Sequence, residues 1–382
     1  MCSYLIFCDD VVEGMVFVRK KIAFVIVSIC ILTLIPIRTF AGELKHLLEV
    51  LLIQYEDYES RFDAIYTQAD IKKQGFTLIE DQCFPVVLES FSEEEIYFLP
   101  IIDRRYGRLG VLLADTAGNI VFKTDQLETN NRFRGQMKQP TKGIAAVSFQ
   151  DMNQDGLTDI VLITNCENST GEYAHKNYKI GDVLFQTEGS FYRDWRISDK
   201  INRFSMNKSI DFIRAYVRDG HSTEILYTAT TLEELLDKGF KIFETQCYTR
   251  RFEKQGMLKI VPGIIEMAEY DIFMIYLVND QGYIVWSFQP MEDYDNLYAM
   301  KGMACRDLDG DGMKDLIILG RYSYSGPNGA LVVDTKCDIY YQRTEGFDVD
   351  TQFRNTYQCT EEDTVEGLVK SIRAYWGWQE EQ

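Results

Sequence analysis

Two aspartate-rich segments have residue types and a spacing that suit a calcium ion. Loop 1 spans residues 151–159 and reads Asp-Met-Asn-Gln-Asp-Gly-Leu-Thr-Asp, and loop 2 spans residues 307–315 and reads Asp-Leu-Asp-Gly-Asp-Gly-Met-Lys-Asp. In both loops, side chains that carry oxygen fall at positions 1, 3, 5 and 9. Calcium takes about six to eight oxygen ligands, and alternate residues of a tightly curled loop can point at one centre. The sequence therefore predicts two structural Ca²⁺ sites, because carboxylates crowded in this way would repel one another without a cation.

The residues between and after these side chains indicate what kind of loop each one is. Glycine at position 6 permits a sharp turn, and the backbone carbonyl of position 7, Leu157 or Met313, is the expected main-chain ligand. A helix-loop-helix hand would need a bidentate Glu at position 12, where Leu162 and Ile318 stand. The apolar, β-branched segments that follow both loops are typical of buried strands. Each loop is therefore expected between two strands.

The chain carries an internal duplication. Residues 75–83 (Gly-Phe-Thr-Leu-Ile-Glu-Asp-Gln-Cys) recur as residues 239–247 (Gly-Phe-Lys-Ile-Phe-Glu-Thr-Gln-Cys), and further matches follow in the same order. The matching pairs downstream are 113–122 with 277–286, the two aspartate-rich loops, Glu188-Gly189 with Glu345-Gly346, and 213–216 with 372–375. We therefore expect a first repeat over residues 67–222 and a second repeat over residues 231–382.

Residues 307–318 resemble an FG-GAP or VCBS-type repeat, the calcium-loop blade of integrin-α-like propellers, and residues 182–191 resemble the outer hairpin of such a blade. The resemblance implies β-propeller-like blades. It also implies calcium ligands from the side chains of Asp151, Asn153, Asp155, Asp159, Asp307, Asp309, Asp311 and Asp315. Loop 2 has four carboxylates and loop 1 has three, so we expect loop 2 to bind calcium more tightly.

Each repeat is expected to be mainly β with flanking helices. Residues 113–122 and 277–286 place apolar, β-prone runs around a polar turn with glycine, which predicts a hairpin. We expect each repeat to begin with a short helix, to continue with about eight short strands and to end with a helix near its Ile-Arg-Ala-Tyr segment. Propellers of the family above repeat a blade at shorter intervals than these loops show. Either each half supplies two blades, one without calcium, or the halves are two tandem compact α+β domains.

The residues before the first repeat predict export. Basic Arg19-Lys20-Lys21 precedes the uncharged apolar stretch 22–37, and small residues follow, so residues 1–41 have the pattern of a secretory signal peptide. The apolar run is short for a membrane span, and Met15 is the more natural initiator. The protein would then be secreted or lie on the extracellular surface, with membrane contact only if this segment is not cleaved. Residues 42–66 have apolar side chains at helical spacing, which predicts an amphipathic helix packed on the first repeat.

Charge and motifs narrow the class of function. With 59 acidic and 40 basic residues the formal net charge is −19, which disfavours nucleic-acid binding. The histidines His46, His175 and His221 are scattered, and HExxH, GxSxG and phosphate-binding glycine motifs do not occur. Six cysteines lie beyond residue 41, an even number that permits disulfides without indicating a pairing.

Two classes of function remain, a binding module and a hydrolase. Tyr173, Tyr322 and Tyr324 lie in segments that we expect to be loops after the calcium strands, where they could stack on sugars or peptides. A glycosidase needs only two suitably spaced carboxylates, and the sequence does not single out a pair. We therefore expect an exported, calcium-binding, non-catalytic module that binds a glycan or a protein. The alternative is an exported carbohydrate-active hydrolase.

Overall fold

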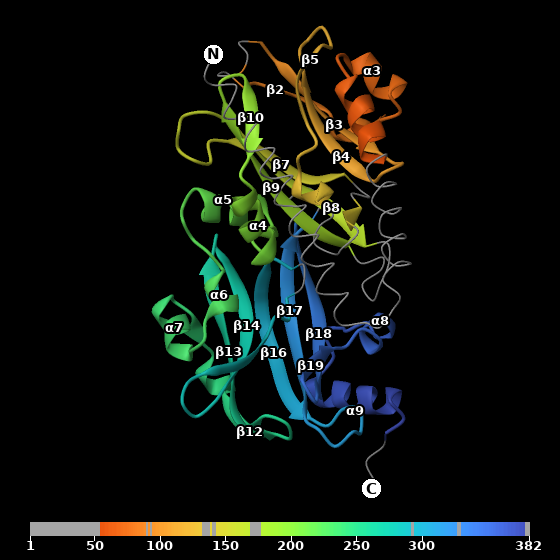
Figure 1. Ribbon diagram of the computed structural model, residues 1–382. Coiled ribbons are helices and arrows are strands. Elements are labelled where there is room, and N and C mark those ends of the chain that lie inside the picture. Colours follow the sequence, from red (N-terminus) through yellow and green to blue (C-terminus); the bar gives the residue numbers. More distant parts are fainter. Residues whose placement is uncertain are drawn as a thin grey trace, which may run out of the picture. The chain divides into compact units, whose positions relative to one another are not determined.

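Antiparallel sheets flanked by short helices make up the part of the chain described by the computed structural model (Figure 1). The structure describes residues 54–88, 91, 94–131, 138–139, 143–168, 177–291, 294–326 and 330–378. The predicted class, mainly β with flanking helices, is confirmed. Whether the sheets are propeller-like blades or parts of tandem domains stays a prediction.

The chain divides into two compact units, Met1–Tyr66 and Thr67–Gln382. In the first unit, residues 54–63 are helical, in agreement with the predicted amphipathic helix over residues 42–66. The predicted signal peptide over residues 1–41 and the start of that helix lie outside the described residues. Among the helices that the structure describes, none is long and apolar enough to cross a membrane. The second unit contains both predicted repeats.

The described strands in the first half of this unit form two sheets of five strands each. The strands are β1 (Thr77–Leu78), β2 (Phe84–Val86), β3 (Ile96–Asp103), β4 (Arg108–Ala114), β5 (Ile120–Thr124), β6 (Lys138–Gln139), β7 (Ile144–Gln150), β8 (Asp159–Asn168), β9 (Asn177–Thr187) and β10 (Ser190–Arg193). The helices are α3 (Gln68–Lys73), η1 (Glu80–Gln82), η2 (Glu128–Asn130), α4 (Trp195–Arg203), α5 (Ile210–Val217) and α6 (Ile225–Thr228). The first sheet has the order β1-β3-β4-β5 with β2 on β3, and the second has the order β10-β9-β8-β6 with β7 on β8.

The second half repeats this plan with one five-stranded and one four-stranded sheet among its described residues. The strands are β11 (Lys241–Ile242), β12 (Tyr248–Phe252), β13 (Gly256–Met267), β14 (Tyr270–Val278), β15 (Ile284–Phe288), β16 (Asn296–Arg306), β17 (Asp315–Ser325), β18 (Leu331–Arg343) and β19 (Gly346–Val349). The helices are α7 (Leu232–Asp237), η4 (Glu244–Gln246), α8 (Phe353–Thr356) and α9 (Val365–Tyr375). The sheet orders are β11-β13-β14-β15, with β12 on β13, and β16-β17-β18-β19.

The strand that follows each aspartate-rich loop is buried on both faces. In β17, Leu316 and Ile318 belong to the core that includes β13 and β14, whereas Ile317 and Leu319 pack with side chains of α9. Neighbouring side chains of a strand point to opposite faces, so an unbroken apolar run needs an apolar layer on each side. Each such buried side chain stabilises the fold by about 1.5–3 kcal/mol. Strand β8 shows the same alternation between the first sheet and the helices α4 and α5.

The two halves share local contacts at matching positions. Helices α3 and α7 both begin with a capping box, in which the amide of a threonine, Thr67 or Thr231, donates to the side chain of an acid three residues later. The amide after each threonine donates to the carbonyl of a hairpin glycine, Gly118 or Gly282, at 2.8 and 3.0 Å. These glycines have φ of 85° and 87°, the left-handed region that glycine enters without strain. The contacts recur as the sequence matches do, although common ancestry of the halves stays a prediction.

Candidate metal centre

Each aspartate-rich loop connects neighbouring strands of the second sheet in its half. Loop 1 leads from β7 into β8, and loop 2 leads from β16 into β17. The aspartate at position 9, Asp159 or Asp315, is the first residue of the second strand and pairs with the last residue of the first strand. The predicted strand–loop–strand arrangement is confirmed, so a helix-loop-helix hand is excluded.

The first aspartate of each loop holds the backbone in a tight curl. In loop 2, the carboxylate of Asp307 accepts hydrogen bonds from the amides of positions 4 and 6 at 2.7 and 2.9 Å. In loop 1, Asp151 accepts the equivalent bonds at 2.7 and 2.9 Å. Position 4 has a positive φ in both loops, 63° at Gln154 and 82° at Gly310. Loop 2 therefore adopts the curl without the backbone strain that a non-glycine residue adds in loop 1.

The last aspartate of each loop is a buried clamp between the loop and the sheet. Asp315 is 0% exposed, and its two carboxylate oxygens accept hydrogen bonds at 2.8 Å from the amides of Leu308 in the loop and Gln342 on β18. Asp159 is also 0% exposed and accepts the equivalent two bonds at 2.8 Å from loop 1 and from β9. The clamp joins each loop to the strand beyond the one that it enters.

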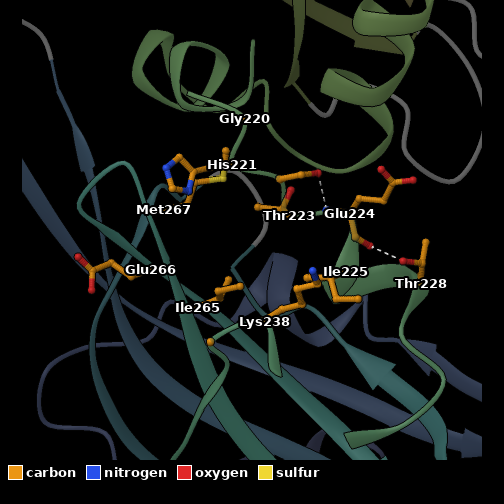
Figure 2. Close-up of a pocket in the computed structure, with 12 residues that line it drawn as sticks. Gly220, His221, Thr223, Glu224, Ile225, Thr228, Lys238, Ile265, Glu266 and Met267 are labelled. Atoms are coloured by element: carbon orange, nitrogen blue, oxygen red, sulfur yellow. Dashed lines mark hydrogen bonds between the residues drawn. The ribbon is translucent and has the colours of Figure 1, made fainter. Parts of the chain in front are cut away.

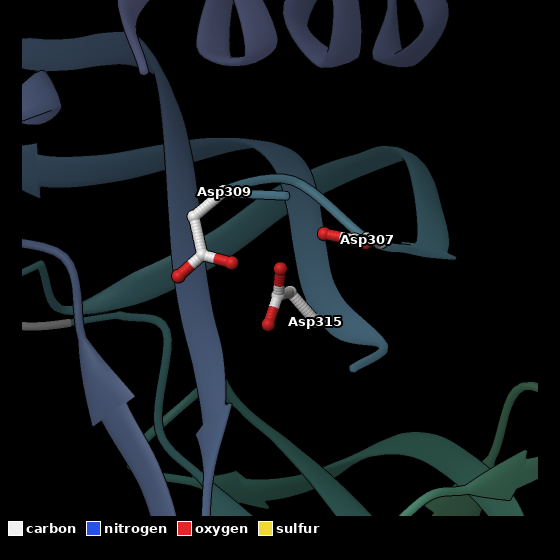
Figure 3. Close-up of side chains that lie close together, drawn as sticks. All are labelled: Asp307, Asp309 and Asp315. Carbon is white, nitrogen blue, oxygen red and sulfur yellow. The ribbon is translucent and has the colours of Figure 1, made fainter. Parts of the chain in front are cut away.

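Three carboxylates gather in loop 2. Oxygen atoms of Asp307, Asp309 and Asp315 all lie within 4.8 Å of one another, and Figure 3 shows the three carboxylates directed toward a shared space. A carboxylate oxygen has two lone pairs, and the backbone hydrogen bonds of Asp307 and Asp315 use one on each oxygen. The group therefore keeps lone pairs for a cation, and a donor set made only of oxygen suits Ca²⁺.

Loop 1 has a weaker set of donors. The amide nitrogen of Asn153 donates to a carboxylate oxygen of Asp155 at 2.9 Å, and its oxygen accepts from the backbone amide of Asp155 at 3.2 Å. Asn153 is neutral, and in the part of the chain that the structure describes only loop 2 brings three acids within this range. Loop 1 would need a small rearrangement of Asn153 and Asp155 to surround an ion.

The two loops also agree at position 7. The backbone amides of Leu157 and Met313 each donate to the carboxylate at position 5, Asp155 or Asp311, at 2.8 Å. These bonds place both residues inside the turn of the loop. Ligation of calcium by their carbonyl oxygens stays a prediction.

Burial and hydrogen bonding shift the pKa values of these aspartates in opposite directions. Desolvation raises the pKa of Asp315 to about 7, and the charges of Asp309 and Asp311 add to this rise. Desolvation also raises the pKa of Asp159. At Asp151 the hydrogen bond from the amide of position 6 is the largest cause of a lowered pKa. A cation among these groups would favour the ionised form of each of them.

Arg343, at the end of β18, is a charged neighbour of loop 2 that the sequence did not point to. Its guanidinium nitrogens lie 2.9 Å from Asp309 and 3.2 Å from Asp311. The residue that corresponds to Arg343 beside loop 1 is Thr187. Arg343 follows Gln342 and Thr187 follows Gln186, the two glutamines whose backbone amides donate to the last aspartate of each loop. The positive charge of Arg343 offsets the additional negative charge that loop 2 carries relative to loop 1. It therefore opposes the tighter calcium binding that we expected there from the carboxylates alone.

Replacement of Arg343 by threonine is expected to tighten calcium binding at loop 2 about tenfold, because a positive charge in contact with Asp309 and Asp311 competes with the ion. The reverse change, Thr187→Arg, should weaken binding at loop 1. Isothermal titration calorimetry with Ca²⁺ measures both affinities, and Arg321→Thr on β17 is a matched control. An unchanged affinity in Arg343→Thr would mean that the guanidinium leaves the loop at no cost when the ion binds.

One predicted ligand surface is wrong. Strand β17 continues to Ser325, so residues 321–325 are not a loop, and Tyr322 is 0% exposed. Tyr324 is half-buried, and its ring lies 5.6 Å from that of Tyr294. Tyr173 lies outside the described residues. The sequence could not show that β17 extends beyond its apolar run and buries Tyr322 in the core.

A pocket of about 550 Å³ lies between residues 220–228 and 265–267 (Figure 2). It is lined by two carboxylates, Glu224 and Glu266, which Figure 2 shows on opposite sides and pointing away from each other. Each forms an ion pair with a lysine, Lys200 at 2.7 Å and Lys241 at 3.2 Å. A glycosidase needs two carboxylates that face one bond, so these residues do not favour the hydrolase alternative.

Comparison with known proteins gives no family. No family model matches the chain, and no curated protein matches it. Among solved structures, an exo-inulinase from Aspergillus awamori matches with 10% sequence identity and a TM-score of 0.21, over 72% of this chain and 50% of that chain. The chain thus spans half the length of that enzyme, and a likeness this weak carries no argument about fold or activity. The resemblance to FG-GAP or VCBS-type repeats stays a prediction.

Proposed function

We propose that the chain is an exported, non-catalytic module that holds one Ca²⁺ in each aspartate-rich loop and binds a glycan or a protein. The observation that supports calcium most strongly is the convergence of Asp307, Asp309 and Asp315 within 4.8 Å. The shared hydrogen bonds of the first and last aspartates extend the proposal to loop 1. The resemblance of the loops to FG-GAP or VCBS-type repeats agrees with it.

The ion would have a structural role. Each loop lies between two paired strands, and its clamp reaches a third strand, so calcium would join these elements and offset the repulsion among the acids. No nucleophile or base is needed for this role. The module would then present its surface to a partner, as calcium-stabilised extracellular domains do.

The surface that best suits a glycan or a protein lies at the junction of β10 and α4. Tyr192 and Trp195 are 50% and 60% exposed, and the guanidinium of Arg196 lies 5.3 Å from the ring of Trp195. Exposed aromatic rings beside a cation can stack on sugars or pack against a protein. This surface replaces the buried Tyr322 as the proposed contact region.

Calcium titration of the purified, metal-free chain tests the proposal directly. Calorimetry should report two sites, of which Asp309→Ala removes one and Asp155→Ala removes the other. Magnesium should bind more weakly, because it demands a smaller and more regular shell of ligands. A chain that takes up no calcium, or one whose uptake survives both substitutions, would rule the two-site proposal out.

A further inference from the structure

Two cysteines meet beneath the C-terminal helix. Cys337 lies on β18, is 4% exposed and belongs to the core between the β16–β19 sheet and α9. Cys359 lies in the connection between α8 and α9, is half-buried and packs against this same core. Both thiols are free in the structure, and each lies near enough to shift the pKa of the other. Two cysteines packed in one core, on segments far apart in the sequence, are placed so that a disulfide could join them.

The connection that carries Cys359 is held in place by its own hydrogen bonds. The carboxylate of Asp363 accepts bonds from the hydroxyl of Tyr357 at 2.5 Å and from the amide of Thr360 at 2.7 Å. The ring of Tyr357 also stacks on Phe353, with centroids 4.9 Å apart. Residues on both sides of Cys359 are therefore fixed, so little ordering is needed to keep its sulfur beside Cys337.

We propose that Cys337 and Cys359 form a disulfide when the folded chain meets a disulfide oxidant. The bond would link β18 covalently to the segment from which α9 begins. This inference concerns neither calcium loop and does not depend on the function proposed above.

The environments of the two thiols set the order of the exchange reaction. The neighbouring Cys337 lowers the pKa of Cys359, while the nearby Cys359 and burial raise the pKa of Cys337. The thiolate of Cys359, which is also the more exposed, attacks a glutathione disulfide and releases one glutathione thiolate. Cys337 then loses its proton and attacks the Cys359 sulfur, which releases the second glutathione. Two protein thiols are oxidised and one glutathione disulfide is reduced.

The other described cysteines occupy separate places. Cys83 and Cys247 donate to the carbonyls four residues before them, at 3.3 and 3.6 Å. Cys166 is buried against the hydroxyl of Thr129, and Cys305 is buried in the core of the second half. These four residues are the internal comparison for selectivity.

The test treats the folded, full-length chain with oxidised glutathione at mildly alkaline pH, alkylates the remaining thiols and maps the peptides by mass spectrometry. We expect one dominant cross-link, between the peptides of Cys337 and Cys359, and a midpoint of thermal unfolding roughly 5 °C above that of the reduced chain. The peptide map identifies the pair whatever Cys2, Cys8 and Cys30 do.

Two variants separate the roles of the thiols. Cys337→Ala should trap glutathione on Cys359 because no thiol resolves the mixed disulfide, and Cys359→Ala should leave Cys337 largely unmodified. Cys247→Ser, the matched control, should form the cross-link as the unmodified chain does. Free thiols at both positions after oxidation, or a dominant cross-link that involves another described cysteine, would overturn the proposal.

Discussion

Calcium at about 2 mM is expected to raise the midpoint of thermal unfolding by roughly 5 °C relative to the same protein in excess EDTA. With a dissociation constant of about 0.1 mM, typical of extracellular sites, ligand binding stabilises the folded state by about 1.8 kcal/mol per site. Two sites together give about 3.6 kcal/mol, which corresponds to this shift for a folded part of about 300 residues. The comparison is made by differential scanning calorimetry.

Single substitutions assign this shift to the two loops. Asp309→Ala and Asp155→Ala should each remove about half of it, and the double variant should unfold at the same temperature with calcium or EDTA. Asp280→Ala, in a hairpin turn away from both loops, is the control and should keep the full shift. If calcium gave no shift in the unmodified chain, both loops would be turns without an ion, and their resemblance to a calcium repeat would lose its main support.

Asp315→Ala is expected to destabilise the protein even without calcium, by about 2 kcal/mol. The substitution leaves the buried amides of Leu308 and Gln342 without their acceptor, at about 1–3 kcal/mol each. Removal of a desolvated carboxylate near Asp309 and Asp311 offsets part of that loss. Urea unfolding in EDTA measures the difference.

Asp309→Ala is the matched comparison for the clamp. Asp309 is a partly exposed residue of the same loop whose described contacts are with Arg343 and the amide of Asp311, so its loss in EDTA should change stability by less than about 1 kcal/mol. The two variants thus distinguish a residue that stabilises the fold without calcium, Asp315, from one that contributes mainly through calcium binding, Asp309. Equal losses in EDTA would contradict this division.

Local signals in the sequence predicted the elements around the site well. The apolar runs after the loops became β8 and β17, and the glycines at 118 and 282 became hairpin turns, because both depend on residues within a few positions. The position of each loop between strands follows from the same local pattern. These features needed no knowledge of distant contacts.

Contacts between distant strands could not be predicted in this way. Arg343 reaches loop 2 because β18 pairs with β17, and no motif near Arg343 signals an acidic partner. Tyr322 is buried because a helix or sheet layer covers each face of the long strand. The polar residues next to it in the sequence give no sign of these layers. The position of Cys359 in the same core as Cys337 likewise depends on where the connection before α9 packs.

The burial of residues 316–319 of β17 on both faces leaves the alignment of this segment with neighbouring strands weakly specified by its own hydrophobicity. A slip of one residue would exchange Leu316 and Ile318 with Ile317 and Leu319, and both layers would still receive aliphatic side chains of similar size. The carboxylate of Asp315 removes this ambiguity, since in a slipped strand it would be buried without the amides of Leu308 and Gln342. The clamp therefore favours one alignment of this segment, and its hydrogen bonds do so without an ion.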